Sequence, residues 1–351
     1  MAADVTRNGA ATVFFRSMDD LHRDVVAWSA ELPADIDVVV GIPRSGLLAA
    51  SVLALHRQVP VADLDGLVAG RHLGGGRRLG QQGEAPALAS ARRILVVDDS
   101  VYSGAAMRAA RAAAAAADLT APVDFAAVYA TRGATHHVDH FYAVVPQPRV
   151  FAWNVLHHEC LVDSCMDIDG VLCRDPSDVE NDDGPRYREF LETVPVRYVP
   201  SVEVGCLVTS RLERYRPETE AWLARAGVRY RRLVMHPATS GTERRAAGDH
   251  GERKANVYLS TDAPLFVESD LAQAVTIAGI SGRPVYCTDV AQMVYPGSTV
   301  EQLSTPTVGR SLAWQVRHQV RLKAKSVRRR LAPARGTSVD LRDDERAPLG
   351  R

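Results

Sequence analysis

The segment Ile94–Ala106, with the sequence ILVVDDSVYSGAA, decides the fold of the first half of the chain. Its four apolar residues predict a buried strand, Asp98 and Asp99 follow, and a small hydroxyl-bearing turn leads into an alanine-rich helix. This strand–turn–helix unit is typical of a parallel α/β sheet that binds ligands at the carboxyl ends of its strands. The carboxylates suit the hydroxyls of a ribose, and the N–H groups at the helix start suit a phosphate.

An upstream segment, Val38–Leu47 (VVVGIPRSGL), is also an apolar strand followed by a glycine-containing turn. Either segment alone fits an ordinary unit of an α/β domain. Together, and in this order, they resemble the signature of type I phosphoribosyltransferases, which use 5-phosphoribosyl 1-diphosphate (PRPP). The resemblance implies that the upstream loop holds the diphosphate and the downstream segment holds the ribose 5-phosphate. The implied PRPP-binding residues are Arg44, Ser45, Gly46, Asp98, Asp99, Tyr102, Ser103, Gly104, Ala105 and Ala106.

The Gly-rich, basic stretch Gly70–Gly83 lies between these two loops and has two interpretations. It is either a plain flexible linker or the mobile flap that the resemblance implies, with Arg71, Arg77 and Arg78 reaching the diphosphate. The alternation of the surrounding elements predicts a parallel sheet. We expect helices over residues 17–32, 47–56 and 105–117, and strands over residues 38–40, 60–64, 94–97, 125–131 and 150–153.

The second half opens with LVDSCMDIDGVL at Leu161–Leu172. We expect a strand here to deliver Asp167 and Asp169 to its carboxyl end, two residues apart and on one face. Carboxylates placed in this way can hold Mg²⁺, with one attacking phosphorus and the other handling the proton. The segment resembles the first motif of the haloacid dehalogenase (HAD) phosphatases.

Three further segments resemble the remaining HAD motifs, in the order of that family. An apolar strand ends at Thr209, Lys254 follows in RKANVYL, and a second strand ends at Glu268-Ser269-Asp270. The resemblance implies that Asp167, Asp169, Thr209 and Lys254 are catalytic. The implied Mg²⁺ ligands are Asp167, Asp169, Glu268 and Asp270, with Glu268 favoured over Asp270 because it comes first after the strand. The segment between Asp169 and Thr209 is too short for a large cap, which predicts an open site for a bulky substrate.

Composition limits the class of protein. The chain has 351 residues, zero formal net charge, 46% hydrophobic residues and five cysteines without a CxxC pair. We therefore expect two domains, no attraction to nucleic acid, and reduced thiols typical of the cytoplasm. The chain has no run of about 18 apolar residues, and its start lacks the pattern of a secretory signal.

The C-terminal segment is basic, and its apolar residues follow a helical stripe. It is interpreted either as a helix docked on the domain, or as a peripheral contact with an anionic membrane or a basic arm for another partner. The predicted organisation is a phosphoribosyltransferase-like domain over 1–158, a HAD-like domain over 159–300, the basic helical tail over 301–335 and a disordered end over 336–351. Both domains are expected to be α/β folds with Rossmann-like parallel sheets.

The leading hypothesis for function is a bifunctional, Mg²⁺-dependent enzyme. It transfers the phosphoribosyl group of PRPP to a small-molecule acceptor and hydrolyses a phosphorylated small molecule through an aspartyl phosphate. The alternative is a PRPP-sensing, non-catalytic module that regulates the phosphatase. The acceptor, the phosphatase substrate, the coupling of the two activities and a homodimeric state are left open, because the pockets that select substrates vary within a fold.

Overall fold

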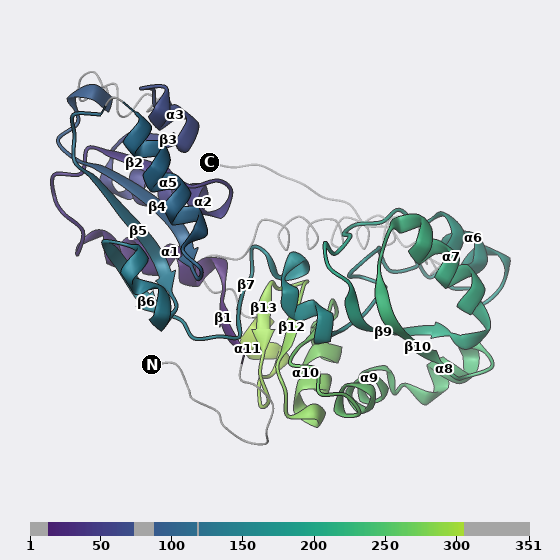
Figure 1. The fold of residues 1–351 in the computed structure, drawn as a ribbon. Helices are drawn as coiled ribbons and strands as arrows, with labels where there is room; N and C mark the ends of the chain where they lie inside the picture. The colour runs from purple at the N-terminus through teal and green to yellow at the C-terminus, as the bar shows by residue number, and fades with distance from the viewer. Residues whose placement is uncertain (1–12, 74–87, 118, 305–351) are drawn as a thin grey trace, which may run out of the picture. The chain divides into compact units, whose positions relative to one another are not determined.

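The structure is a computed structural model that describes residues 13–73, 88–117 and 119–304 (Figure 1). The chain divides into compact units at 1–309 and 310–351. The second unit lies outside the described residues, as do residues 305–335 of the predicted basic tail, the predicted disordered end, and Arg77 and Arg78 of the predicted flap. None of the helices that the structure describes is long and apolar enough to cross a membrane.

A five-stranded parallel sheet, in the order β3-β2-β4-β5-β6, forms the first half of the described chain. In this order β4, which contains Asp98 and Asp99, lies at the centre of the sheet. It is next to β2, the strand that leads into the upstream loop. The strands are β2 (Val38–Gly41), β3 (Val61–Asp63), β4 (Ile94–Val101), β5 (Val123–Ala130) and β6 (His140–Val144).

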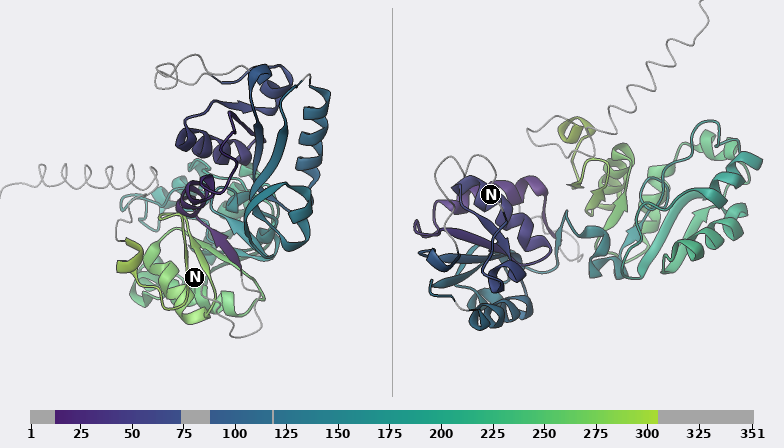
Figure 2. Two further views of the ribbon diagram at one scale, coloured as in Figure 1. Left: turned by 90° about the vertical axis from the view of Figure 1, so that its left-hand side faces the viewer. Right: turned by 90° about the horizontal axis from the view of Figure 1, so that it is seen from above.

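Alternating side chains of the central strands bury both faces of this sheet. Leu95 and Val97 pack with α1 and α2, whereas Ile94 and Val96 pack with α3 and α5. Figure 2 shows these helices on either side of the strands. Ser17, the first residue of the predicted helix, caps α1 through a reciprocal capping box with Asp20. The helices are α1 (Met18–Ser29), α2 (Ser45–Arg57), α3 (Leu64–Val68) and α5 (Ala105–Ala116).

The end of the first half differs from the expectation. The last strand of the sheet is β6, whereas the predicted strand at 150–153 is β7 (Arg149–Phe151), which pairs in parallel with β1 (Phe14–Arg16) in a separate two-stranded sheet. Phe15 and Val150 of these strands belong to a hydrophobic cluster of the second half. The pattern of apolar residues identified the strand correctly but gave no information on its partner, which tertiary packing selects.

The second half contains a six-stranded sheet in the order β10-β9-β8-β11-β12-β13. All neighbouring strands are parallel except β12 and β13. The short central strand β8 is therefore flanked by β9, which contains Thr209, and by β11, which ends at Glu268. The strands are β8 (Cys165–Met166), β9 (Val204–Leu212), β10 (Tyr230–His236), β11 (Phe266–Glu268), β12 (Val285–Cys287) and β13 (Gln292–Val294).

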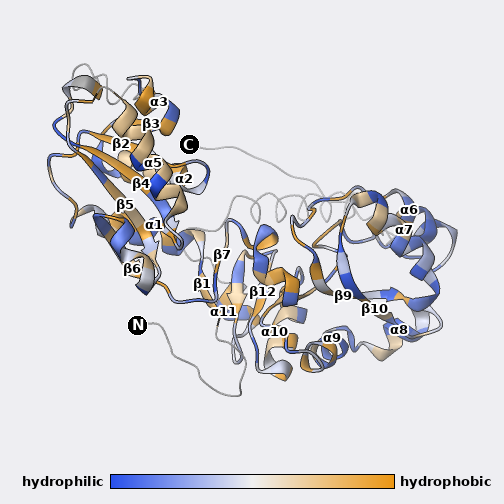
Figure 3. Ribbon diagram, viewed as in Figure 1, coloured by the Kyte–Doolittle hydropathy of each residue, from blue (hydrophilic) through white to orange (hydrophobic). Residues whose placement is uncertain are grey.

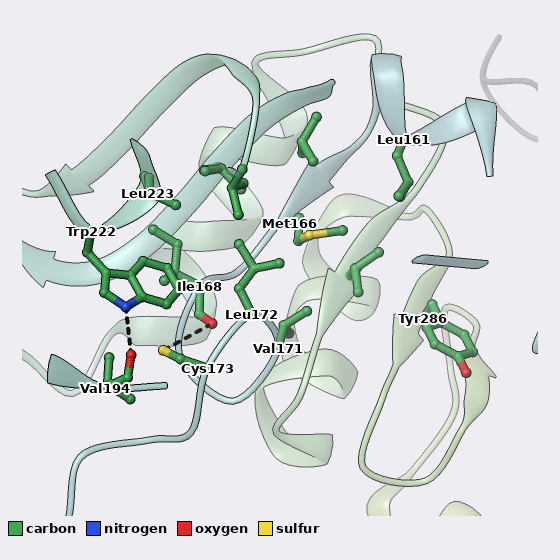
Figure 4. Close-up of a cluster of buried hydrophobic side chains, with 14 of the residues drawn as sticks. Leu161, Met166, Ile168, Val171, Leu172, Cys173, Val194, Trp222, Leu223 and Tyr286 are labelled. Carbon is green, nitrogen blue, oxygen red and sulfur yellow. Dashed lines mark hydrogen bonds between the residues drawn. The ribbon is translucent and has the colours of Figure 1, made fainter. Parts of the chain in front are cut away.

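The two faces of this sheet are covered by different helices. One face packs on α6 and α7, where Trp222 donates its indole N–H to the carbonyl of Val194 at 2.8 Å (Figure 4). The other face packs on α9 and α10. Orange strand segments in Figure 3 show the hydrophobic character of the sheets. The helices are α6 (Pro185–Thr193), α7 (Arg216–Ala226), α8 (Gly241–Ala247), α9 (His250–Leu259), α10 (Leu271–Ser281) and α11 (Val300–Ser304).

The predicted strand before Asp167 is shorter than expected. Residues Glu159–Asp163 form a 3-10 helix, and only Cys165–Met166 are extended. Ser164 ends the helical turn by donating its hydroxyl to the carbonyl of Cys160 at 2.6 Å, which explains why the apolar run does not continue as a strand. The other 3-10 helices are Leu88–Ser90, Arg132–His137, Val155–His157 and Glu213–Tyr215.

Candidate functional site

Asp98 and Asp99 lie at the carboxyl end of β4, where the side chains of both are buried. Ser45, the first residue of α2, donates its hydroxyl to Asp99 Oδ1 at 2.7 Å. The indole N–H of Trp153 donates to Asp99 Oδ2 at 2.9 Å. The upstream loop, the central strand and the segment after β7 are therefore joined through one carboxylate. The strand continues to Val101, so the two aspartates belong to the strand rather than to the turn after it.

Two glycines allow the close approaches that this arrangement requires. A Cβ on Gly46 would lie 2.7 Å from the carbonyl oxygen of Val97, so only a glycine lets the start of α2 pack against β4. Gly104 has a φ of +70°, and a Cβ there would lie 2.3 Å from the ring of His137. Gly104 is thus required both by its left-handed backbone and by its neighbour, and it precedes the first turn of α5.

The electrostatic setting of Asp98 is unusual. Burial, and next the charge of Asp99, raise the pKa of Asp98 to about 8. Arg149 is 4% exposed, interacts electrostatically with both aspartates and donates to the carbonyl of Val101 at 3.2 Å. Its Nη1 has no hydrogen-bond partner among the described residues. The pair of carboxyl groups therefore lies beside one buried guanidinium that is not fully hydrogen-bonded.

The remaining predicted PRPP residues follow β2 and β4 along the chain. Arg44, Tyr102, Ser103, Ala105 and Ala106 are exposed, with Tyr102 at 63%. Ser103 Oγ accepts the N–H of Ala105 in a long contact of 3.4 Å. Because α5 begins here without a side-chain cap from Gly104, the first N–H groups of the helix are suited to an anionic oxygen.

A second acidic cluster surrounds Lys254, one of three lysines in the chain. The ammonium group is 2% exposed and donates to Asp167 Oδ2 at 2.7 Å, to Glu268 Oε2 at 2.6 Å and to Gln273 Oε1 at 3.0 Å. Burial raises the pKa of Asp167 well above its usual range, against the opposing effect of Lys254. Three predicted residues from distant segments thus meet at the carboxyl end of β8.

Asp169 is held by a residue that the sequence analysis did not identify. Arg211 is fully buried and donates to Asp169 through Nε at 3.1 Å and Nη2 at 2.7 Å. Such a two-point contact fixes the orientation of a carboxylate. The sequence contained a clue to this residue, because Arg211 lies two positions after Thr209, near the end of the same strand. Thr209 is fully buried at that end.

The two alternatives for the fourth motif occupy different places. Glu268 is fully buried and accepts the N–H groups of Ser269 and Asp270 at 2.9 and 3.2 Å. Asp270 is exposed and caps α10 by accepting the N–H of Gln273 at 2.9 Å. Glu268 therefore lies with Asp167 and Lys254, and Asp270 lies outside their hydrogen bonds. Nowhere in the described ranges do three His, Cys, Asp or Glu side chains form a ready metal-binding group.

The structure thus separates the predicted residues into two sets on two sheets. It also adds Trp153, Arg149, Arg211 and Gln273, which contact the predicted residues directly or electrostatically. Trp153 ends the strand predicted over 150–153, which gave no sign of its contact with Asp99. No feature of the sequence pointed to Arg149 or Gln273, because their positions depend on packing between distant elements.

Comparison with known proteins gives one family match. Residues 17–163 match the model of the phosphoribosyl transferase domain. No curated protein matches the chain.

Solved structures resemble part of the chain. A purine phosphoribosyltransferase from Pyrococcus horikoshii is 19% identical, with a TM-score of 0.30, over 40% of this chain and 92% of its own. A xanthine-guanine-hypoxanthine phosphoribosyltransferase from Helicobacter pylori is 18% identical, with a TM-score of 0.32, over 42% and 95%. A hypothetical protein from Neisseria gonorrhoeae with bound ppGpp is 16% identical, with a TM-score of 0.31, over 42% and 92%.

Proposed function

We propose that this chain is a bifunctional, Mg²⁺-dependent enzyme whose first half, a phosphoribosyltransferase-type domain, transfers the phosphoribosyl group of PRPP. We further propose that its second half is a HAD-type phosphatase acting through Asp167. The observation that supports the first activity is the junction of Ser45 and Trp153 at Asp99. The observation that supports the second is the buried contact of Lys254 with Asp167 and Glu268.

In the proposed transferase, the protein positions PRPP and takes no covalent part. Asp98 and Asp99 accept the ribose hydroxyls, the first N–H groups of α5 bind the 5-phosphate, and the loop at Arg44–Gly46 receives the diphosphate. The anomeric carbon–oxygen bond to the diphosphate breaks as the acceptor nitrogen or oxygen attacks. The type of domain favours a nucleobase-like acceptor.

In the proposed phosphatase, the Asp167 carboxylate attacks phosphorus and the bond to the leaving oxygen breaks. Asp169 gives that oxygen a proton, then takes one from the water that hydrolyses the aspartyl phosphate and releases orthophosphate. Thr209 and Lys254 stabilise the transferring group. Arg211 orients Asp169 for both proton steps through its two hydrogen bonds.

The carboxylates around Asp167 have the donor chemistry of a divalent-cation site, although no three of them among the described residues form a ready metal-binding group as placed. Asp175 interacts electrostatically with Asp169, Glu268 and Lys254, so carboxylates outnumber the cationic Lys254 and Arg211 here. Carboxylate oxygens are the donors that Mg²⁺ prefers. Asp167, Asp169 and Glu268 would hold the ion, with Asp270 as the alternative to Glu268. When bound, Mg²⁺ supplies positive charge to the phosphoryl oxygens.

The test is ³¹P NMR of the full chain with Mg²⁺, PRPP and a pool of nucleobases, with and without the substitution Asp167→Asn. We expect diphosphate to appear only with the acceptor pool, and phosphate release from phosphate monoesters to fall at least about 10³-fold in Asp167→Asn, because the nucleophile is lost. Asp163→Asn, at an exposed position four residues earlier, is the matched control.

Two results would contradict these proposals separately. If Asp167→Asn releases orthophosphate as fast as the parent protein, the phosphatase assignment is wrong. If PRPP binds but survives with every acceptor, the first site is a sensing module. In that case, PRPP should change the phosphatase rate without being consumed.

A further inference from the structure

A group of basic side chains surrounds the segment Thr209–Arg211, next to the proposed phosphoryl site. They come from β9, the end of β10, α8 and α9, and only the lysine belongs to a motif of the sequence. The group, called the Ser210 cluster below, consists of Arg211, His236, Arg244, His250, Arg253 and Lys254.

Arg244 is the most informative member of the Ser210 cluster. It is 8% exposed, and its hydrogen bonds go to the Ser210 carbonyl at 3.0 Å and to Asn181 Oδ1 at 3.1 Å. Both acceptors are neutral, and the Nε of Arg244 has no partner among the described residues. A buried guanidinium without an anionic partner is costly, because burial removes its hydration without a compensating charge.

The neighbouring cations Arg211 and Lys254, unlike Arg244, have anionic partners. Arg211 contacts Asp169, and Lys254 contacts Asp167 and Glu268, so both charges are balanced by carboxylates. The Tyr187 hydroxyl interacts electrostatically with Asp169, Arg211 and Arg244. Arg244 and the proposed proton-transfer group Asp169 therefore both lie near the Tyr187 hydroxyl, while the hydrogen bonds of Arg244 go to neutral oxygens.

Helix α9 brings two further groups to the same place. His250 and Lys254 are four residues apart and so share one face of the helix. Lys254 contacts Asp167, and His250 Nδ1 lies 3.1 Å from Ser210 Oγ. Burial, and next the charges of Arg244 and Lys254, lower the pKa of His250, against the opposing charge of Asp249. Arg253 extends the group by donating to the Thr209 carbonyl at 3.4 Å.

From this arrangement, and resting on the proposed phosphatase activity, we infer that the Ser210 cluster binds a second anionic group of the phosphatase substrate. The substrate is then a phosphate monoester that also carries a carboxylate or a further phosphate. Arg244 is the residue that selects it, since a guanidinium recognises planar or tetrahedral oxyanions through two N–H groups. An anion there would supply the missing counter-charge.

The activity test uses substrates that differ only in the second group. With Mg²⁺ and the full chain, we would compare 3-phosphoglycerate with glycerol 3-phosphate, and ribose 1,5-bisphosphate with ribose 5-phosphate. We expect kcat/KM to be higher for the doubly anionic member of each pair, and Arg244→Gln to lower the ratio within each pair about tenfold. Arg245→Gln, at the exposed next position of α8, should leave the ratio unchanged.

A binding test does not depend on turnover or on the parent activity. Calorimetric titration of 3-phosphoglycerate into Asp167→Asn and into Asp167→Asn/Arg244→Gln should show about tenfold weaker binding in the double variant. Binding at the first domain is the same in both proteins and cancels in the comparison. Arg253→Gln, at a half-buried position, repeats the test if Arg244→Gln lowers the melting temperature.

The outcomes separate this inference from the proposed function. Equal affinities in the two Asp167 variants, or an unchanged substrate ratio in Arg244→Gln, would overturn the second-anion site even if the phosphatase is active. Hydrolysis of no monoester, with weaker binding in the double variant, would overturn the phosphatase and support the anion site.

Discussion

The two acidic sites of this chain differ in how their carboxylates are neutralised. Asp99 is held by a hydroxyl and an indole N–H, both uncharged, and the nearby Arg149 interacts with the pair without a hydrogen bond to it. Asp167 and Asp169 are each bonded to a buried cation. The carboxyl groups of the first site therefore have no hydrogen-bonded cation, whereas those of the second site are already bonded to Lys254 and Arg211 without a ligand.

This difference has a physical consequence. The donors to Asp99 are uncharged, as ribose hydroxyls are, so the first site can exchange one kind of hydrogen bond for the other at little net cost. The second site contains buried ion pairs, and removing one partner of such a pair leaves the other charge buried and uncompensated. We therefore expect substitutions at the second site to change folding stability, and those at the first to change binding and pH dependence.

The largest expected effect is that of Lys254→Met. It leaves Asp167 and Glu268 buried without their shared cation, which should lower the free energy of unfolding by about 3–5 kcal/mol. Urea denaturation at pH 7 measures this loss. Arg225→Met, at an exposed position of α7, is the control and should change stability little. If Lys254→Met costs less than about 1 kcal/mol, the ion pairs of the second site are not structural and the comparison fails.

A smaller effect concerns the pH dependence caused by Asp98. Its pKa of about 8 in the folded chain exceeds the ordinary value of 3.8, so between these values the folded state binds more protons than the unfolded state. Stability should therefore fall as pH rises from 5 to 8, with this group contributing up to about 1.4 kcal/mol per pH unit. Asp98→Asn should flatten that slope in urea denaturation.

The matched control for Asp98 is Asp65→Asn, at an exposed position of α3. It should retain the slope of the parent protein. Parallel slopes for the parent and Asp98→Asn would show that Asp98 titrates normally, and the charge balance of the first site would then need another account.

The smallest expected effect is that of Ser45→Ala. It removes one neutral donor to Asp99 while the indole of Trp153 remains, so PRPP affinity should fall about fivefold, equivalent to about 1 kcal/mol. Calorimetric titration of PRPP measures it. Ser51→Ala on the same helix removes a hydroxyl that donates to the Leu47 carbonyl, away from Asp99. Equal affinities for the two variants would mean that Ser45 does not orient the carboxylate.

The local elements were the most predictable part of the fold. Strands β2, β4 and β5 and helices α1, α2 and α5 lie where the apolar patterns and the Ser17 cap place them. The prediction failed where partners mattered. The apolar residues of β6 alternate weakly, so this strand was missed, and β7 was assigned to the wrong sheet. Strand β10, with exposed Arg231 and Arg232, was missed for the same reason.

The sequence by itself determined the strand–turn–helix units and the chemical type of each loop, because backbone preferences and short motifs act over a few neighbouring residues. It also named Asp98, Asp99, Asp167 and Lys254. Only the tertiary structure decided their counter-charges, since Arg211 reaches Asp169 and Trp153 reaches Asp99 from elements far along the chain. Electrostatic free energy depends on distances between side chains and on burial, and packing alone determines both.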